Sequence, residues 1–354
     1  MRSLVLLVPG RVDTLTGGYA YDRQMVDGLR ARGWSMVVRE LDDSFPQPTA
    51  AARGDAARAL AAIPDASTVL VDGLALGAMP DEVWRAGQRL RIIALVHHPL
   101  AAETGIEPHI VRRLEESERR ALAAVRLVIV TSRATAAALD RYGVAANRIA
   151  VVEPGTDRAP LARGSPGPTR HLLCVASLVP RKGHDILLRA LADVPRTDWI
   201  LTCVGSPLRS PATAERLCAL IEAEGLEDHV RLVGEVDGAT LAEGYDAADV
   251  FVLPTRHEGY GMAVAEALAH GLPVVSTPTG AIADLVGRDA GMLVPPGDVE
   301  ALTAALWRVL DDDGLRERLR EGARRVRNRL PTWEHQAGRM ADVLERDCDE
   351  RVQS

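Results

Sequence analysis

Short apolar runs alternate with alanine-rich or amphipathic runs along most of the 354-residue chain, and this alternation constrains the fold more than any other feature. Residues 4–8, 68–71 and 92–96 are typical of buried strands, whereas residues 50–63 and 107–124 are typical of helices. Strands that alternate with helices are joined by right-handed crossovers and pair in parallel. The chain is therefore predicted to be an α/β protein.

A break in composition divides this pattern into two halves. Residues 154–168 are rich in Pro, Gly, Arg and Ser, and the alternation restarts at residue 172. A single core stops growing near ~250–300 residues, so a chain of this length favours two domains. We expect one domain over residues 1–160 and a second over residues 165–330. In the last segment, residues 331–354, a final helix is expected over residues 333–346.

Polar residues stand where several strands of the first half end, and ligands of parallel sheets gather at those ends. Asp72, His97 and Ser132 fall at such positions. His97 is followed by His98 and a proline, a pattern that favours a pocket role over a histidine that only caps its own sheet. Gly17 and Gly18 lie between the first strand and the first helix. They allow either the close approach of a phosphate or simply a tight turn.

The stretch over residues 249–275 is the most informative part of the second half. It contains a strand, a polar turn with Tyr260 between two glycines, and an alanine-rich helix that ends before Gly271. Amides at a helix start favour an anion, and here they belong to Gly261, Met262 and Ala263. Glu258 and Glu266 can accept hydrogen bonds from hydroxyl groups. A phosphate beside hydroxyl groups describes a nucleotide sugar, although an acidic helix start with a surface glutamate would have the same pattern.

Lysine is almost absent from this chain. Of 42 Lys and Arg residues only Lys182 is lysine, which leaves 42 − 1 = 41 arginines. It lies in a glycine-bounded turn directly after a predicted strand. A compact ammonium group is not equivalent to a planar guanidinium. We therefore interpret Lys182 as a functional residue.

Composition argues against several other classes of function. The net charge of −7 argues against nucleic acid as a main partner. The apolar run after Met1 is too short for a signal peptide, and no run approaches the ~18 residues of a membrane span, so a cytoplasmic protein without a transmembrane segment is expected. The four cysteines form no CxxC pair and are expected to be buried thiols rather than metal ligands. They are Cys174, Cys203, Cys218 and Cys348.

Two motifs resemble those of the retaining family-4 glycosyltransferases, also described as glycosyl transferases group 1. Glu258-Gly259-Tyr260-Gly261 followed by Glu266 is similar to the family's EGFG-x4-E signature, and residues 175–183, VASLVPRKG, resemble its GRL-x3-KG turn. The resemblance implies a GT-B fold, in which two Rossmann-like domains face each other across a cleft and the last helix returns to the first domain. It also implies retaining transfer of a hexose-type sugar from a nucleotide diphosphate sugar to an acceptor hydroxyl.

The resemblance assigns a role to each matching residue. It implies His97, Lys182 and Glu258 as catalytic residues, with His97 beside the donor sugar and Lys182 on the diphosphate. The donor-binding set that it implies is Gly17, Gly18, Arg181, Lys182, Glu235, Val236, Glu258, Gly259, Tyr260, Gly261, Met262, Ala263 and Glu266. Glu266 would bind ribose hydroxyls, and Glu235 with Val236 would lie near the nucleobase. The chain departs from the family at Ser177, where an arginine is usual, and Arg181 is expected to supply the missing charge.

The chemistry that the resemblance implies needs no metal, no cofactor and no covalent carboxylate, because the leaving diphosphate takes the acceptor's proton. Two alternatives stay open: a retaining disaccharide phosphorylase of the same fold and a two-lobed non-catalytic sugar- or nucleotide-binding protein. An oxidoreductase is disfavoured because no GxGxxG follows a predicted strand. The acceptor is expected to be soluble rather than lipid. Arg112-Arg113 and Arg119-Arg120 are interleaved with glutamates in a pattern typical of a solvated helix face; those glutamates are Glu115, Glu116 and Glu118.

Overall fold

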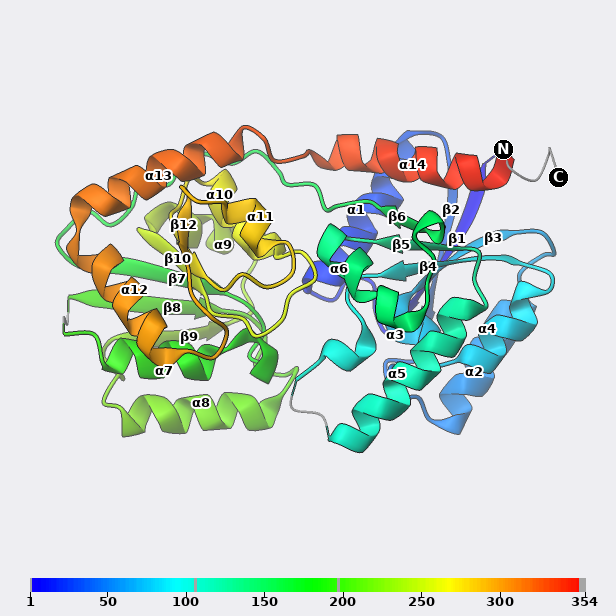
Figure 1. Ribbon diagram of the computed structural model, residues 1–354, viewed down its shortest axis with the longest axis horizontal. Coiled ribbons are helices and arrows are strands. Elements are labelled where there is room, and N and C mark those ends of the chain that lie inside the picture. Colours follow the sequence, from blue (N-terminus) through cyan, green and yellow to red (C-terminus); the bar gives the residue numbers. More distant parts are fainter. Residues whose placement is uncertain (1, 105–106, 196–197, 350–354) are drawn as a thin grey trace. The chain divides into compact units, whose positions relative to one another are not determined.

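A computed structural model describes residues 2–104, 107–195 and 198–349 of the chain (Figure 1). The chain divides into two compact units. Unit 1 comprises residues 1–155 and 331–354, and unit 2 comprises residues 156–330. The two units are described separately below.

Unit 1 is built on a six-stranded parallel sheet of strand order β2-β1-β3-β4-β5-β6. β3 and β4 lie inside this sheet and consist almost wholly of buried residues, which explains their continuous apolar sequences. The strands are β1 (Ser3–Pro9), β2 (Ser35–Leu41), β3 (Thr68–Asp72), β4 (Arg91–Val96), β5 (Leu127–Val130) and β6 (Ile149–Val151).

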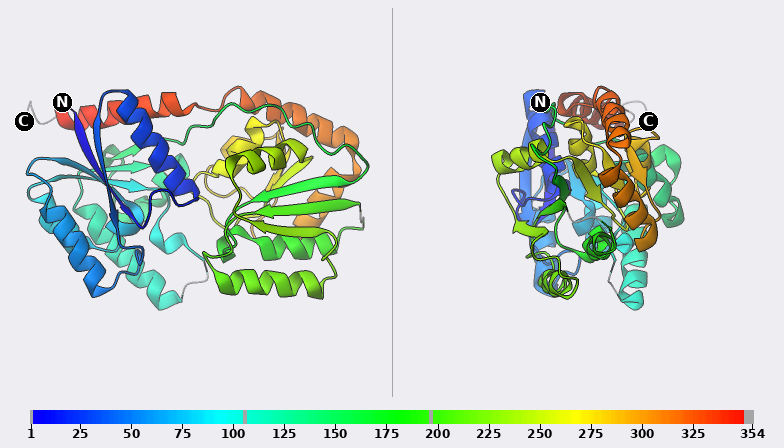
Figure 2. Two further views of the ribbon diagram at one scale, coloured as in Figure 1. Left: turned by 180° about the vertical axis from the view of Figure 1, so that it is seen from behind. Right: turned by 90° about the vertical axis from the view of Figure 1, so that its left-hand side faces the viewer.

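Helices connect these strands, and the chain returns to unit 1 in its last helix. The helices are α1 (Gly17–Ala31), α2 (Ala50–Ala61), α3 (Gly73–Leu76), α4 (Pro80–Gly87), α5 (Pro108–Ala123), α6 (Arg133–Ala138) and α14 (Trp333–Asp349). α14 packs against α1, as Figure 1 and Figure 2 both show. A Cβ placed on Gly28 would lie 2.3 Å from the Cβ of Ala337, so the two helices approach too closely for a side chain there.

The sequence did not lead us to expect α3 and α4, because both are too short for a clear helical period. Each nevertheless has a start signal. The Asp72 side chain accepts a hydrogen bond from the Leu74 amide at the start of α3, and Pro80 occupies the first turn of α4. α1 begins at Gly17, so Gly17 and Gly18 belong to its first turn rather than to a loop before it, because the Thr16 hydroxyl caps the helix by accepting from the Tyr19 amide.

Unit 2 contains the second parallel sheet, with strand order β12-β11-β10-β7-β8-β9. From β7 the chain moves outward through β8 and β9, and then returns to β10 on the other side of β7. β7 and β10 are thus neighbours whose connections diverge, which is where parallel α/β sheets form a ligand crevice. The strands are β7 (Arg170–Val175), β8 (Trp199–Val204), β9 (Val230–Gly234), β10 (Val250–Leu253), β11 (Val274–Ser276) and β12 (Gly291–Leu293).

The helices of unit 2 close its core without residues from unit 1. Aliphatic side chains from the strands and from α7, α10 and α12 form one continuous buried cluster. The helices are α7 (His184–Ala192), α8 (Pro211–Ala223), α9 (Gly238–Ala247), α10 (Met262–Ala269), α11 (Ile282–Val286), α12 (Val299–Asp311) and α13 (Asp313–Arg327).

The segment that we expected to be a linker is bound to unit 2 over part of its length. The Ala162 amide donates to the His270 carbonyl at 2.8 Å, and the Gly164 amide donates to the Asp246 carbonyl at 2.9 Å. Arg163 forms an ion pair with Asp246. Backbone hydrogen bonds therefore hold this Pro- and Gly-rich stretch against unit 2.

None of the helices among the described residues combines the length and the apolar character that a membrane crossing needs.

Candidate functional site

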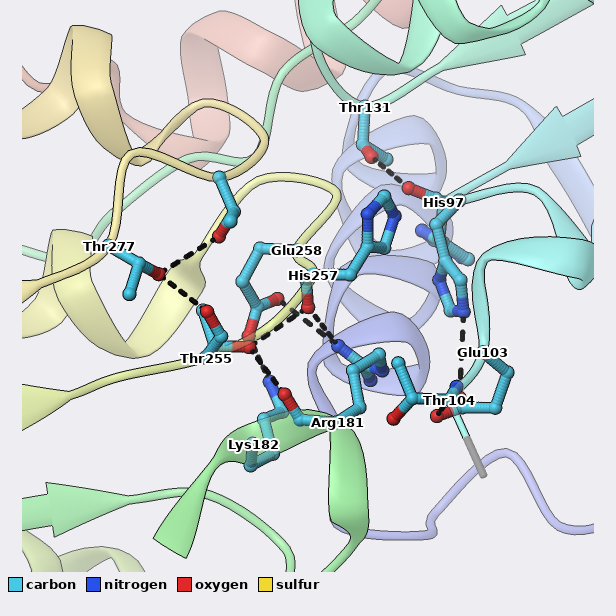
Figure 3. Close-up of polar contacts among 12 residues, drawn as sticks. His97, Glu103, Thr104, Thr131, Arg181, Lys182, Thr255, His257, Glu258 and Thr277 are labelled. Atoms are coloured by element: carbon cyan, nitrogen blue, oxygen red, sulfur yellow. Dashed lines mark hydrogen bonds and ion pairs between the residues drawn. The ribbon is translucent and has the colours of Figure 1, made fainter. Parts of the chain in front are cut away.

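Two loops of unit 2 meet at the carboxyl ends of β7 and β10, where the strand order reverses. The first is the 3₁₀ turn η4 (Pro180–Lys182), and the second follows β10. Backbone and side-chain hydrogen bonds join them (Figure 3). The Arg256 amide donates to the Arg181 carbonyl at 2.8 Å. Arg181 Nη1 donates to the His257 carbonyl at 2.8 Å. The Thr255 hydroxyl donates to the Arg181 carbonyl at 3.0 Å.

Two glycines allow these loops to pass so closely. Gly183 has φ +73°, and a Cβ there would fall 2.2 Å from the carbonyl oxygen of Pro254, which follows β10. Gly280 has φ +57°, and a Cβ there would fall 2.2 Å from the carbonyl oxygen of Glu258. Both positions need a left-handed conformation and the absence of a side chain. The backbone therefore holds Lys182 and Glu258 side by side.

Three charged side chains form the centre of this site. Lys182 donates a hydrogen bond from Nζ to Glu258 Oε1, and Arg181 Nη1 lies 3.7 Å from Glu258 Oε2. Only 9% to 17% of each side chain is exposed. Burial acts to raise the pKa of Glu258, but the charges of Lys182 and Arg181 outweigh it and hold that pKa below its usual value. The glutamate is therefore ionised between two cations.

Helix α10 begins directly beside this cluster. Gly261 adopts φ +96° at its N-cap, and the amides of the first turn have no acceptor within the helix. One turn further on, Glu266 accepts a hydrogen bond from the Tyr245 hydroxyl at 2.9 Å. Burial raises the pKa of Glu266 to about 6 despite this hydrogen bond. The helix thus offers free amides at its start and a carboxylate that titrates close to neutral pH.

The remaining predicted residues of unit 2 lie at different distances from the charged cluster of Lys182, Arg181 and Glu258. Tyr260 is buried against Ala265 and Ala281. Glu235 and Val236 follow β9, the edge strand on the other side of β8 from β7, so they are two strands away from the cluster. An ion pair that we did not predict supports the loop: Arg256 binds both carboxylate oxygens of Asp185 at 2.8 and 3.0 Å.

In unit 1 the predicted residues His97 and Gly18 are neighbours. A Cβ on Gly18 would lie 3.4 Å from His97 Cδ2, so only a small residue fits there without displacing the imidazole. The backbone of His97 is held by the hydroxyls of Thr131 and Thr135, which donate to its carbonyl oxygen at 3.2 and 3.3 Å (Figure 3 shows the Thr131 contact). Two buried carboxylates, Asp22 and Asp72, face its Nε2.

Two sequence-based expectations were wrong. Glu118 does not lie on a solvated face of α5: it is 1% exposed, and its Oε2 accepts the Leu100 amide at 3.0 Å, which ties the segment after His98 to the helix. Its position on the apolar side of α5, four residues after Leu114, was the missed signal. Cys218 is exposed rather than buried, whereas Cys174 and Cys203 are buried as expected.

One group in unit 2 has the composition of a metal-binding set. Cys174 and Cys203 lie opposite each other on β7 and β8, and the Nε2 atom of His184 lies 3.6 Å from Cys174 Sγ. One ligand atom from each of these three residues lies within 4.8 Å of the others. The cysteines are 29 residues apart in sequence, so no short motif could have indicated this proximity.

Both units are thus Rossmann-like α/β layers, and unit 2 carries cationic side chains, helix-start amides and two glutamates at its switch point. This combination of groups is suited to a ligand that carries phosphate together with hydroxyl groups. Two family models agree: "Glycosyl transferases group 1" matches residues 158–326, and "Glycosyltransferase Family 4" matches residues 70–159. The chain belongs to the family-4 glycosyltransferases.

Two curated relatives show how far the similarity extends. An MMP alpha-(1->4)-mannosyltransferase of Mycolicibacterium hassiacum is 30% identical over 319 residues, which cover 85% of this chain and 76% of the relative. A D-inositol 3-phosphate glycosyltransferase of Jonesia denitrificans is 36% identical over 173 residues, 47% of this chain. That match spans only 41% of the length of the relative.

Among solved structures, a sucrose-phosphate synthase from Thermosynechococcus elongatus has a TM-score of 0.85 to this chain. The alignment covers 99% of this chain and 100% of the other at 23% sequence identity. At that identity the similarity establishes the fold. The predicted α/β class and GT-B architecture are confirmed, and the individual roles of the site residues stay predictions.

Proposed function

We propose that this protein is a retaining glycosyltransferase that moves a hexose-type sugar from a nucleotide diphosphate sugar to an acceptor hydroxyl. The observation that carries the proposal is the buried group of Lys182, Arg181 and Glu258 beside the start of α10. When ionised, these side chains sum to a charge of +1, and the helix dipole adds partial positive charge. Such a site suits a diphosphate better than a neutral ligand.

In the proposed reaction the acceptor oxygen attacks C1 of the donor sugar while the bond between C1 and the diphosphate oxygen breaks on the same face. The proton of the acceptor hydroxyl passes to the departing diphosphate. Lys182, Arg181 and the first amides of α10 stabilise the negative charge that develops on the leaving group. Positioned cations then supply the charge stabilisation for which other transferases use a metal ion.

The other predicted residues would position the two ends of the donor. Glu258 is held by two cations, so its remaining lone pairs can orient a hydroxyl of the sugar. Glu266 would accept hydrogen bonds from ribose hydroxyls. His97 of unit 1 would lie by the donor sugar, and the Gly17–Gly18 segment would lie over the diphosphate and the acceptor. These assignments follow the resemblance to the family.

The acceptor is proposed to be a small hydroxylated molecule rather than a lipid. One relative is described as a D-inositol 3-phosphate glycosyltransferase, a name that specifies a small hydroxylated compound. On α5, Arg119 pairs with Glu116 at 2.6 Å and lies 3.8 Å from Glu115, so its charge is balanced within the helix. Arg120 pairs with Asp81 of α4 at 2.6 Å, and arginines that are already paired with carboxylates are poorly suited to an anionic lipid surface.

A donor screen tests this proposal. The full-length protein is incubated with UDP-, GDP- and ADP-sugars, with and without sugar phosphates and inositol phosphates as acceptors, and nucleotide release is measured. We expect acceptor-dependent release of one nucleoside diphosphate, retained configuration at C1 by NMR, and no loss of rate in EDTA. Release of sugar 1-phosphate from a disaccharide that depends on inorganic phosphate would instead identify a phosphorylase. Binding without turnover across the panel would contradict a transferase.

A further inference from the structure

Two carboxylates from different elements of unit 1 enclose the imidazole of His97. Its Nε2 atom lies 3.3 Å from Asp22 Oδ1, on α1, and 3.5 Å from Asp72 Oδ2, at the end of β3. The Asp22 side chain is fully buried, Asp72 is 3% exposed, and the imidazole is 19% exposed. The side of the ring that carries Nε2 is therefore shielded, and the ring keeps a limited opening to its surroundings.

The two carboxylates differ in what else they bind. Asp72 also caps α3, because its Oδ1 accepts the Leu74 amide at 2.8 Å. Among the residues that the structure describes, neither oxygen of Asp22 has a conventional hydrogen-bond partner, and its ion pair is with His97. A buried carboxylate is strongly destabilising unless an opposite charge accompanies it. Burial acts to raise the pKa of Asp22, and the charge of His97 opposes this, so an ionised Asp22 needs a positively charged His97 beside it.

The other groups around His97 do not neutralise or replace its ion pair with Asp22. The ring of Tyr21 meets the imidazole edge-on at a centroid distance of 5.4 Å, and its hydroxyl donates to the Val152 carbonyl at 3.0 Å. Burial raises the pKa of Tyr21 well above its usual value, so it stays neutral. Arg23, next to Asp22, donates to the carbonyls of Val12 and Thr14. His98 lies 4.0 Å from a different acid, Glu103.

We propose that Asp22 is a positioning residue that, together with Asp72, keeps His97 in the doubly protonated imidazolium form and fixes its orientation. Because Nε2 lies against the two carboxylates, Nδ1–H is the remaining donor of the ring. A charged donor forms hydrogen bonds roughly twice as strong as a neutral one. This proposal deepens the proposed function, because His97 would then present a permanent positive donor to an oxygen of the sugar substrate.

The electrostatic balance agrees with this geometry. Burial acts to lower the pKa of His97, but the charges of the nearby Asp22 and Asp72 carboxylates outweigh it and raise that pKa to about 10. An ordinary histidine, with a pKa near ~6.5, would be mostly neutral at pH 7.5. The carboxylates thus remove the pH switch that a histidine normally carries in this range.

The direct test is a histidine NMR titration of the full-length protein without substrate. In the wild type we expect His97 to stay protonated up to at least pH 8.5. Asp22→Asn should lower its titration midpoint by more than one pH unit. Asp27→Asn is the matched control, because Asp27 lies on the same helix with 73% of its side chain exposed and should leave the midpoint unchanged. An unchanged midpoint in Asp22→Asn would overturn the proposal.

A second variant keeps the test decisive if Asp22→Asn gives no soluble protein. Asp72→Asn retains a side-chain oxygen for capping α3 but removes the other charge. Its midpoint should also fall, and an unchanged midpoint there would overturn the proposal equally. Since neither titration measures turnover, their outcome is independent of whether the donor screen finds a glycosyltransferase.

The pH dependence of turnover then separates positioning from a merely structural role. If the transferase is active, kcat/KM of Asp22→Asn should approach the wild-type value near pH 6 and fall tenfold for each pH unit above the lowered titration midpoint of His97 in that variant, as His97 loses its proton. A loss of kcat/KM by the same factor at every pH would show that Asp22 serves only to pack the helix, and it would overturn the proposal.

Discussion

The charged group of Lys182, Arg181 and Glu258 shows what single residues contribute to this protein. Taking ions out of water costs several kcal/mol each, and a buried pair recovers this only with good geometry and further hydrogen bonds. Here two cations share one carboxylate, and Arg181 also donates to the His257 carbonyl. Burial lowers the pKa of Lys182, the neighbouring Arg181 lowers it further, and Glu258 opposes both. A bound anion would relieve the repulsion between the two cations.

Replacing Lys182 tests whether its positive charge stabilises the leaving diphosphate. Lys182→Ala should reduce kcat by about a hundredfold or more, because a preorganised charge is lost. Lys182→Arg should recover only part of the rate, since the guanidinium is bulkier. Steady-state kinetics on the donor found in the screen measure both. Arg170→Ala is the control: its side chain pairs with Asp313 at the other end of β7, and the rate should not change. Near-wild-type turnover in Lys182→Ala would rule out the phosphate role.

The raised pKa of Glu266 leads to a prediction about how the stability of the protein depends on pH. Its pKa in the folded protein, about 6, is above the ordinary 4.5, so its contribution to stability is fully present below pH 4.5 and is lost as pH rises through 6. We therefore compare the free energy of unfolding of Glu266→Gln with that of the wild type at each pH. The value for the variant minus that for the wild type should be about 1–2 kcal/mol larger at pH 8 than at pH 4.5. Urea unfolding at the two pH values measures the difference.

The same variant tests the ribose contact. Glu266→Gln should weaken binding of the free nucleoside diphosphate about tenfold at pH 7.5, because an amide oxygen replaces a carboxylate as the acceptor of the ribose hydroxyls. Isothermal titration calorimetry measures the affinity. If the affinity is the same in both proteins, Glu266 does not bind the nucleotide.

At the scale of elements, the site depends on how turn η4 and helix α7 cross the end of β10. Residues 180–183 follow β7 directly, while residues 254–258 follow β10, so sheet order alone makes them neighbours. Gly183 lets the two backbones touch, and the ion pair of Arg256 with Asp185 ties the second loop to the first turn of α7. The position of Lys182 therefore depends on backbone packing as well as on its own ion pair.

Gly183→Ala should damage both stability and binding. The left-handed conformation alone costs about 1–2 kcal/mol for a residue with a Cβ, and the clash with the Pro254 carbonyl adds to this. Gly225→Ala is a matched control, because Gly225 also has a positive φ, +64°, but a Cβ there would meet no atom within 4 Å. We expect Gly183→Ala to lose more stability than Gly225→Ala in urea unfolding, and to lose nucleotide affinity as well. Equal losses of stability with unchanged affinity would show that the close approach is not needed.

At the scale of the whole molecule, the two units have separate cores. The buried cluster of unit 2 contains only residues between 162 and 330. Unit 1 completes its own layer with α14, which the chain reaches only after finishing unit 2. Unit 2 thus contains a complete core together with every cationic and amide group that we assign to the diphosphate.

We therefore predict that residues 156–330 expressed alone bind a nucleoside diphosphate. The affinity measured by calorimetry should lie within about tenfold of that of the full chain, because the proposed charged contacts are all present. Transfer should be absent, since His97 is missing. Circular dichroism with a cooperative thermal transition must first show that the fragment is folded. A folded fragment with no nucleotide affinity would show that unit 1 provides the main nucleotide site.

The sequence by itself determined the α/β class, nearly all strands and long helices, and the motif residues Lys182, Glu258 and Glu266. These features follow from the spacing of apolar residues along the chain and from glycine-bounded turns, and both depend only on residues that are close in sequence. Tertiary structure decided which groups meet. Lys182 and Glu258 are 76 residues apart, and Asp22 and His97 are 75 apart, so their pairing depends on strand order. The contact of Cys174 with His184 could not be predicted either, because whether a polar side chain faces water or a partner depends on which element packs over it.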